Sequence, residues 1–192
     1  MDVREEILSA ATELFHEKGL HFTMDDVAVQ LHRAKKTIYR FYPSKEDLLS
    51  GLLTYGFEQI QHTKEEILKS DLPLEEKLAR VLVAFPDVYQ KLDFSKLNEL
   101  GEKYPKIAQD LRRHLEDGWE PIIALMEEGV AQGKIRPVNL KVFRLIATAD
   151  LEYFVSSNEL ERAGVEYHEA LDSMVDIFMK GLMVHDAESN AQ

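Results

Sequence analysis

Residues suited to contacting nucleic acid gather in one short stretch of the chain. They are Lys35, Lys36, Thr37, Tyr39 and Arg40, within the run KKTIYRF. Lys and Arg side chains pair with phosphate oxygens, and Lys, Arg and Thr also hydrogen-bond to base edges in the major groove. The chemistry expected of this stretch is recognition of a duplex.

The same stretch is a basic island in an acidic chain. The segment from Val27 to Lys45 holds five Lys or Arg residues and no Asp or Glu, whereas the whole chain of 192 residues has a formal net charge of −12. A duplex responds to the charge of the face presented to it, within a screening length of roughly 10 Å. The local charge therefore favours nucleic-acid binding, and the acidic remainder favours solubility.

Two short helices separated by a tight turn are predicted to present these side chains. Thr23 and Asp26 have the spacing of a capping box, which predicts a helix that begins at Met24. An apolar stripe with Ala28 at its centre follows, and a small residue there permits close crossing by a second helix. In that second helix Ile38 continues the buried face, so the polar residues are expected to point outward.

Flanking helices complete this arrangement. Asp2 and Glu5 predict a first helix that ends at Gly19, where a left-handed conformation suits glycine. After the second short helix, Ser44 and Asp47 predict the start of a long helix that reaches about residue 69. The first helix is expected to pack across the two short ones and give them a core.

These runs together resemble a known family. TMDDVA followed by KKTIYRFYPSKEDLL, and preceded by ILSAATELFHEKG, is similar to the DNA-binding domain of the TetR family of bacterial transcriptional regulators, over about the first quarter of the chain. The resemblance implies an all-α protein: a three-helix helix-turn-helix domain (1–46), joined by a long helix to a larger effector-binding and dimerisation domain (47–186), with a flexible tail (187–192).

Three successive residues depart from the family pattern. His32 replaces a turn glycine, Arg33 replaces a buried aliphatic residue, and Ala34 replaces a serine cap. We therefore expect His32 to take a left-handed or strained conformation and the second helix to lack a side-chain cap.

The resemblance and the local charge assign a set of DNA contacts. Lys45 and Thr23 are expected mainly at phosphates, and Lys36 and Thr37 partly at base edges. The full set is Thr23, Arg33, Lys35, Lys36, Thr37, Tyr39, Arg40, Tyr42 and Lys45.

The rest of the chain reads as helical, with no hairpin signal. Helices are predicted over 74–92, 94–103, 105–132 with a break at 118–121, 139–157 and 165–184. Cysteine is absent, which excludes disulfides and thiolate metal sites, and no apolar run reaches the length of a bilayer span. We expect a cytoplasmic protein with no cofactor, no metal and no membrane partner.

The last two helices are apolar on more than one face, which suggests burial against a partner as well as inward. In the resembling family this pair forms a four-helix bundle with the same pair of a second subunit, which implies a homodimer. The alternative is a deeper core within one chain. The predicted interface residues are Phe143, Ile146, Phe154, Leu171, Met174, Phe178 and Leu182.

Aromatic residues and Met surround helix breaks at Pro86 and Pro121, as in a ligand cavity among helices, although an ordinary core has the same composition. A small-molecule effector, largely apolar or aromatic, is expected there. The predicted lining is Leu82, Phe85, Tyr89, Tyr104, Trp119, Ile123 and Met126. His114, four residues after Asp110, is interpreted as a solvated side chain.

The favoured function is a ligand-responsive dimeric transcriptional repressor that binds a near-palindromic operator of double-stranded DNA. One alternative is a DNA-binding protein without an effector. The other is a helical enzyme, which the sequence disfavours because it offers no Cys nucleophile, no Gly-rich phosphate loop and no His-rich spacing.

Overall fold

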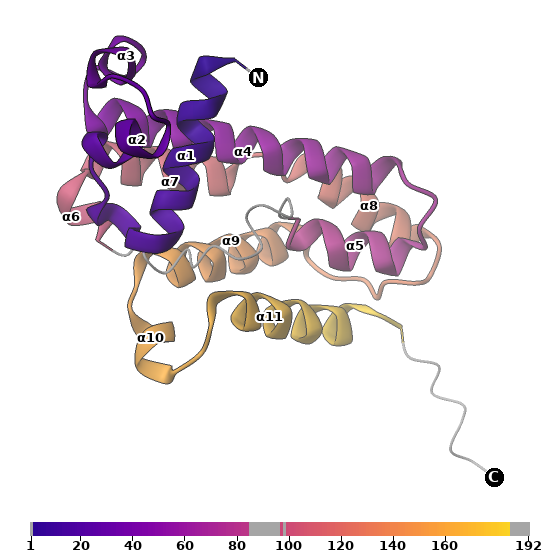
Figure 1. Cartoon of the computed structure of the whole chain (residues 1–192). Helices are drawn as coiled ribbons and strands as arrows, with labels where there is room; N and C mark the ends of the chain where they lie inside the picture. Colours follow the sequence, from indigo (N-terminus) through magenta and orange to yellow (C-terminus); the bar gives the residue numbers. More distant parts are fainter. Residues whose placement is uncertain (1, 85–96, 98, 185–192) are drawn as a thin grey trace.

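The computed structural model describes residues 2–84, 97 and 99–184, and these residues form an all-α fold (Figure 1). No strand occurs in these described ranges, where extended pairing is limited to a bridge between Ile135 and Met183. The all-α prediction is confirmed.

The N-terminal unit consists of three α-helices and one turn of 3₁₀ helix. They are α1 (Val3–Lys18), η1 (Gly19–His21), α2 (Met24–Gln30) and α3 (Lys35–Phe41). The predicted capping box is confirmed, because the Asp26 amide donates to Thr23 Oγ1 at 3.1 Å and the Thr23 amide donates to Asp26 Oδ2 at 2.7 Å. Gly19 ends α1 with a φ of 57°, also as predicted.

Helix α4 (Lys45–Lys69) has the predicted bounds. Its first turn is capped by Ser44, whose Oγ accepts from the Asp47 amide at 3.0 Å. Figure 1 shows α4 running from the N-terminal unit along the larger C-terminal part of the molecule. The long helix therefore belongs to both parts, and any tilt of α4 moves one relative to the other.

The C-terminal part contains seven further described helices: α5 (Leu74–Leu82), α6 (Leu100–Lys103), α7 (Pro105–Glu116), α8 (Glu120–Ala131), α9 (Leu140–Ser156), α10 (Glu159–Ala163) and α11 (Tyr167–Leu182). The predicted break lies between α7 and α8. The short α10 was not predicted. Most of the region from 85 to 98, including Pro86, lies outside the described residues.

The buried apolar residues form two clusters. The first joins the N-terminal unit to the C-terminal part, since it unites Ile7, Ile38 and Leu48 with Leu111 and Leu171. The second lies within the C-terminal part and is built from α5, α8, the start of α9 and the end of α11. The N-terminal unit is thus not packed as an isolated domain.

Within the described ranges, no helix combines the length and the apolar character needed to cross a bilayer.

Candidate DNA-binding surface and central cavity

Helix α3 is anchored by one fully buried side chain and presents four exposed polar ones. Ile38 is fully buried in the first cluster, whereas Lys35, Lys36, Tyr39 and Arg40 are exposed. Exposed polar side chains on a helix anchored in this way are available to a partner. The prediction that these four side chains point outward is confirmed, whereas Thr37, which was predicted to do the same, is half-buried.

The turn between α2 and α3 is strained in the predicted way. His32 has a φ of 50°, and among the described residues it is the one non-glycine with positive φ. Ala34 stands at the N-cap of α3 and makes no side-chain cap. The turn is held by backbone bonds instead, since the Arg33 amide donates to the Ala28 carbonyl at 3.0 Å.

Two of the predicted DNA-contacting cations are paired within the chain. Arg33 pairs with Glu6 on α1, and Lys35 pairs with Asp25 on α2. All four side chains remain partly or fully exposed, and such pairs contribute little to stability. These pairs orient the two cations while neutralising part of their charge.

Lys45 is also engaged inside the protein. Its ammonium donates to the Leu20 carbonyl and lies 4.9 Å from the centroid of the Phe22 ring. Loss of solvent lowers the pKa of Lys45, and the positive charge of Lys103 lowers it further. Lys45 therefore joins the start of α4 to η1, and its predicted contact with a phosphate stays a prediction.

Tyr42 corrects the sequence prediction. Its side chain is only 4% exposed, and it belongs to the first cluster. The Arg4 guanidinium covers the ring at 5.4 Å, and a Cβ built on Gly51 would approach it to 2.6 Å. A ring enclosed on these sides supports the core and is not presented to DNA.

A smaller set is left to face a duplex. Lys36 makes no hydrogen bond or ion pair with any described residue, Tyr39 is 45% exposed, and Thr37 lies between them on α3. The Thr23 hydroxyl is already committed to Asp26 at 2.8 Å. Arg40 lies 5.0 Å from the Phe41 ring centroid.

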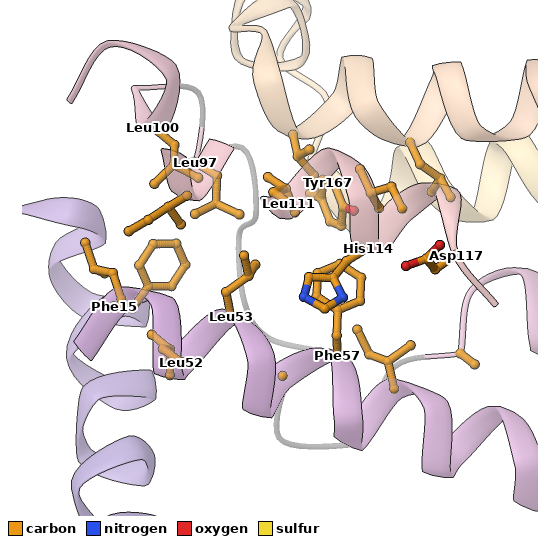
Figure 2. Close-up of a pocket in the computed structure, with 18 of the residues that line it drawn as sticks. Phe15, Leu52, Leu53, Phe57, Leu97, Leu100, Leu111, His114, Asp117 and Tyr167 are labelled. Carbon is orange, nitrogen blue, oxygen red and sulfur yellow. The ribbon is translucent and has the colours of Figure 1, made fainter. Parts of the chain in front are cut away.

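A cavity of about 140 Å³ lies at the junction of the N-terminal unit and the C-terminal part. Its wall includes Thr12 and Phe15 of α1 and Leu20 of η1, and the other lining residues come mainly from α4 and α7. Figure 2 shows Phe15, Leu52 and other apolar side chains together at one end. We call this space the central cavity.

Polar side chains occupy the other end. Asp117 follows α7, and His114 stacks on Phe57 with ring centroids 4.6 Å apart and planes 11° apart (Figure 2). The interpretation of His114 as a solvated side chain is thus wrong, because its ring stacks on Phe57 and the residue is half-buried. Lys64 of α4 also lines the cavity.

Two of the predicted lining residues, Leu82 and Trp119, border the central cavity. Tyr104, Ile123 and Met126 do not: Tyr104 packs beside the first cluster, while Met126 and Ile123 belong to the second. Their helices turn those side chains into close-packed core. Phe85 and Tyr89 lie outside the described residues.

The sequence analysis assigned no residue of α4 to the cavity, although the spacing of residues along this helix indicates a shared face. Leu53, Phe57, Ile60 and Lys64 recur at intervals of four, three and four, and all four line the central cavity. The lysine thus occupies the next position of an apolar stripe, where a core-facing helix would normally carry another apolar residue. In the described residues no cluster of three His, Asp or Glu groups suits a metal ion.

The last two helices present an apolar face different from the predicted one. Phe143, Leu171, Met174 and Leu182 are buried within one chain, and Phe178 packs on Phe143 at 5.2 Å. Their inward orientation corrects the prediction that they meet a partner, and Phe154 is likewise partly buried. Ile146 is 48% exposed. The exposed face, here the α9/α11 face, consists of Val142, Leu145, Ile146, Tyr153 and Ile177.

Comparison with known proteins identifies this arrangement. Residues 7–52 match the family model described as "Bacterial regulatory proteins, tetR family". The uncharacterized HTH-type transcriptional regulator YvaF of Bacillus subtilis is 27% identical over 192 residues, which is 100% of each chain. The fatty acid metabolism regulator protein of B. subtilis is 27% identical over 135 residues, 68% of this chain and 70% of that protein.

Solved structures share the fold. A TetR/AcrR family regulator from Thermobifida fusca has a TM-score of 0.68 at 22% identity, covering 94% of this chain and 98% of that chain. The regulator FadR from B. subtilis, in complex with stearoyl-CoA, has a TM-score of 0.62 at 22% identity, covering 94% and 99%. Residues 7–52 therefore match the tetR family of bacterial regulatory proteins, and the chain as a whole is similar to HTH-type transcriptional regulators.

Proposed function

We propose that this regulator is a dimeric repressor, released from a near-palindromic operator by a mainly apolar effector in the central cavity. The observation that carries the proposal is the composition of the cavity wall. Thr12, Phe15 and Leu20 come from the N-terminal unit, and Leu111 and Tyr167 come from the C-terminal part. A ligand that contacts both favours one relative placement of the two, which is the requirement for coupling.

DNA reading is assigned to α3. The exposed Lys36 and Tyr39 and the half-buried Thr37 enter a major groove, while Arg33 and Lys35 stand beside the phosphate backbone. In a two-fold dimer, two α3 helices meet half-sites about one helical turn apart, roughly 34 Å. A shift of α4 alters that spacing and weakens binding.

Relatives support an acyl-chain effector. One matched protein is named a fatty acid metabolism regulator, and another structure of this fold contains stearoyl-CoA. The apolar wall of the central cavity suits such a chain.

Selection of bound duplexes from a random pool tests the DNA part of the proposal. A palindromic product with two half-sites is expected. Displacement of the selected, fluorescently labelled duplex by fatty acids or their CoA esters then tests the effector. Enrichment of a palindrome that none of these compounds displaces would favour the alternative of a regulator without an acyl effector.

Sedimentation tests the dimer. Leu145, 68% exposed on the α9/α11 face, is the residue to change. Leu145→Glu should convert a dimer into a folded monomer at micromolar concentration, because a charge would be buried in an apolar interface. Val29→Glu is the matched control, since Val29 is 72% exposed on α2 and should leave the dimer intact. A wild-type protein that sediments as a monomer contradicts the proposal.

A further inference from the structure

Lys64 is an unusual lining residue for the central cavity. It continues the stripe of Leu53, Phe57 and Ile60 on α4, so the helix turns it toward the cavity rather than toward water. Its side chain is largely buried, and it makes no hydrogen bond or ion pair with any residue that the structure describes. Buried ammonium groups are normally paired.

The electrostatics agree with an unneutralised cation. Loss of solvent lowers the pKa of Lys64, and no neighbouring carboxylate offsets that effect. Asp117 lines the same cavity but forms no ion pair with Lys64. An anion brought close to the ammonium would recover part of the free energy lost on burial.

The central cavity is therefore amphipathic along its length. Phe15, Leu52 and Leu100 gather at the end near α1 (Figure 2), and Lys64 lies fifteen residues beyond Leu49 on α4, both of which line the wall. At about 1.5 Å per residue this separates the two ends by roughly 22 Å along the helix. A molecule with an apolar chain and one charged end matches this arrangement.

We propose that the central cavity binds an amphipathic anion, with its negative group on the Lys64 ammonium and its hydrocarbon chain pointing from there toward the α1 end. This rests on the proposed effector function and adds the charge, the orientation and the recognising residue. A carboxylate of a free acid and a phosphate of a CoA ester share this chemistry, and the experiment distinguishes them.

Calorimetric titration of the full-length protein without DNA provides the test. Octanoate, octanoyl-CoA and 1-octanol share one chain and differ in the end group. A medium chain is chosen because the cavity of about 140 Å³ is close to the roughly 150 Å³ of a cavity that holds benzene. Wild-type protein should bind an anionic probe at least about 10-fold more tightly than octanol.

Variants assign this preference to one residue. Lys64→Met should lower the affinity for the anionic probe by about 10-fold or more and leave the affinity for octanol unchanged. Lys64→Arg should retain most of the affinity for the anion. Lys69→Met is the control, since Lys69 is exposed on the same helix and pairs with Glu65. If Lys64→Met loses affinity for octanoate alone, Lys64 binds a carboxylate. If it loses affinity for octanoyl-CoA alone, Lys64 binds the phosphates of the CoA ester.

The outcomes separate this inference from the proposed function. Equal binding of octanoate, octanoyl-CoA and octanol by wild-type protein overturns the role of Lys64, even where each of them displaces operator DNA. Anion binding that depends on Lys64 but leaves operator DNA bound supports the inference and contradicts effector control. Failure of all three probes to bind overturns the inference and contradicts an acyl effector of this length.

Discussion

In the N-terminal unit, each cap and turn joins residues that are only a few positions apart in the sequence. The central cavity instead brings together residues as far apart in the sequence as Thr12 and Tyr167. The capping bond of α2 spans three residues, and the turn after it is closed by the bond from Arg33 to Ala28. The cavity exists only because five or more helices meet in one arrangement. Local bonds make the DNA-reading surface robust, and distant contacts make the cavity adjustable.

The largest effect expected from this difference concerns two leucines of α4. Leu48 is fully buried in the first cluster, whereas Leu53 borders the central cavity. Leu48→Ala should destabilise the protein by about 2 to 5 kcal/mol. Leu53→Ala should cost markedly less, because Leu53 already lacks neighbours on its cavity side. Urea unfolding of both variants measures the difference, and equal losses would show that the cavity wall is packed as tightly as the core.

Two neighbouring lysines of α3 should differ in their contribution to DNA binding. Lys36 has no partner among the described residues, whereas Lys35 pairs with Asp25. If Lys36 reads a base, Lys36→Ala should weaken binding to the selected operator by about 1 to 3 kcal/mol. If Lys36 binds a phosphate, the same change should reduce the slope of log affinity against log salt concentration by roughly one unit per contact. Lys35→Ala should have the smaller effect in the same salt titration. The reverse order would mean that the pair with Asp25 opens on DNA.

The sequence predicted the N-terminal unit well because its determinants are local. Thr23 with Asp26, Ser44 with Asp47, and Gly19 each specify a helix boundary through bonds within a few residues. The buried Tyr42 was misassigned because an aromatic residue beside basic ones has the same local pattern whether it faces DNA or the core. Its burial depends on Arg4 and Gly51, which pattern and spacing do not bring together.

The cavity was predicted as a feature but not residue by residue. The helix breaks led to the expectation of a cavity, yet Met126 and Ile123 near Pro121 pack in the second cluster, while Phe57 and His114 line the central cavity. Helical periodicity tells which residues share a face, and the crossing of distant helices decides what that face meets. Lys64 was the one local irregularity that marked the site.

Substitutions in the turn before α3 should change the stability of the protein by a smaller amount. His32→Gly should stabilise the protein by about 0.5 to 1 kcal/mol, because glycine adopts a φ of 50° without strain. Ala34→Ser should add a similar amount by capping α3. Thermal unfolding of each variant measures the gain. Destabilisation by both would mean that the turn has a different geometry in solution.

The smallest effect is the acid response of the α2 cap. Hydrogen bonds from Lys18 and Thr23 lower the pKa of Asp26 from 3.8 to about 2. A lowered pKa means that the cap contributes fully above pH 3.8 and loses its contribution as the pH falls toward 2. Asp26→Asn should therefore be less stable than wild type at neutral pH, and the difference should shrink in acid. A pH series of melting temperatures tests this, and a constant difference would contradict it.

The wall that α1 shares with the central cavity also constrains how this regulator can evolve. Phe15 lies in the first cluster, which holds α1 against the helix-turn-helix, and at the same time it faces the cavity. A mutation there that admits a longer ligand also shifts the helices that meet the operator. Mutations near Lys64 and Asp117 are far from α3 and carry no such penalty. New ligand specificities should therefore accumulate first at the polar end, with the apolar end changing only together with the operator sequence.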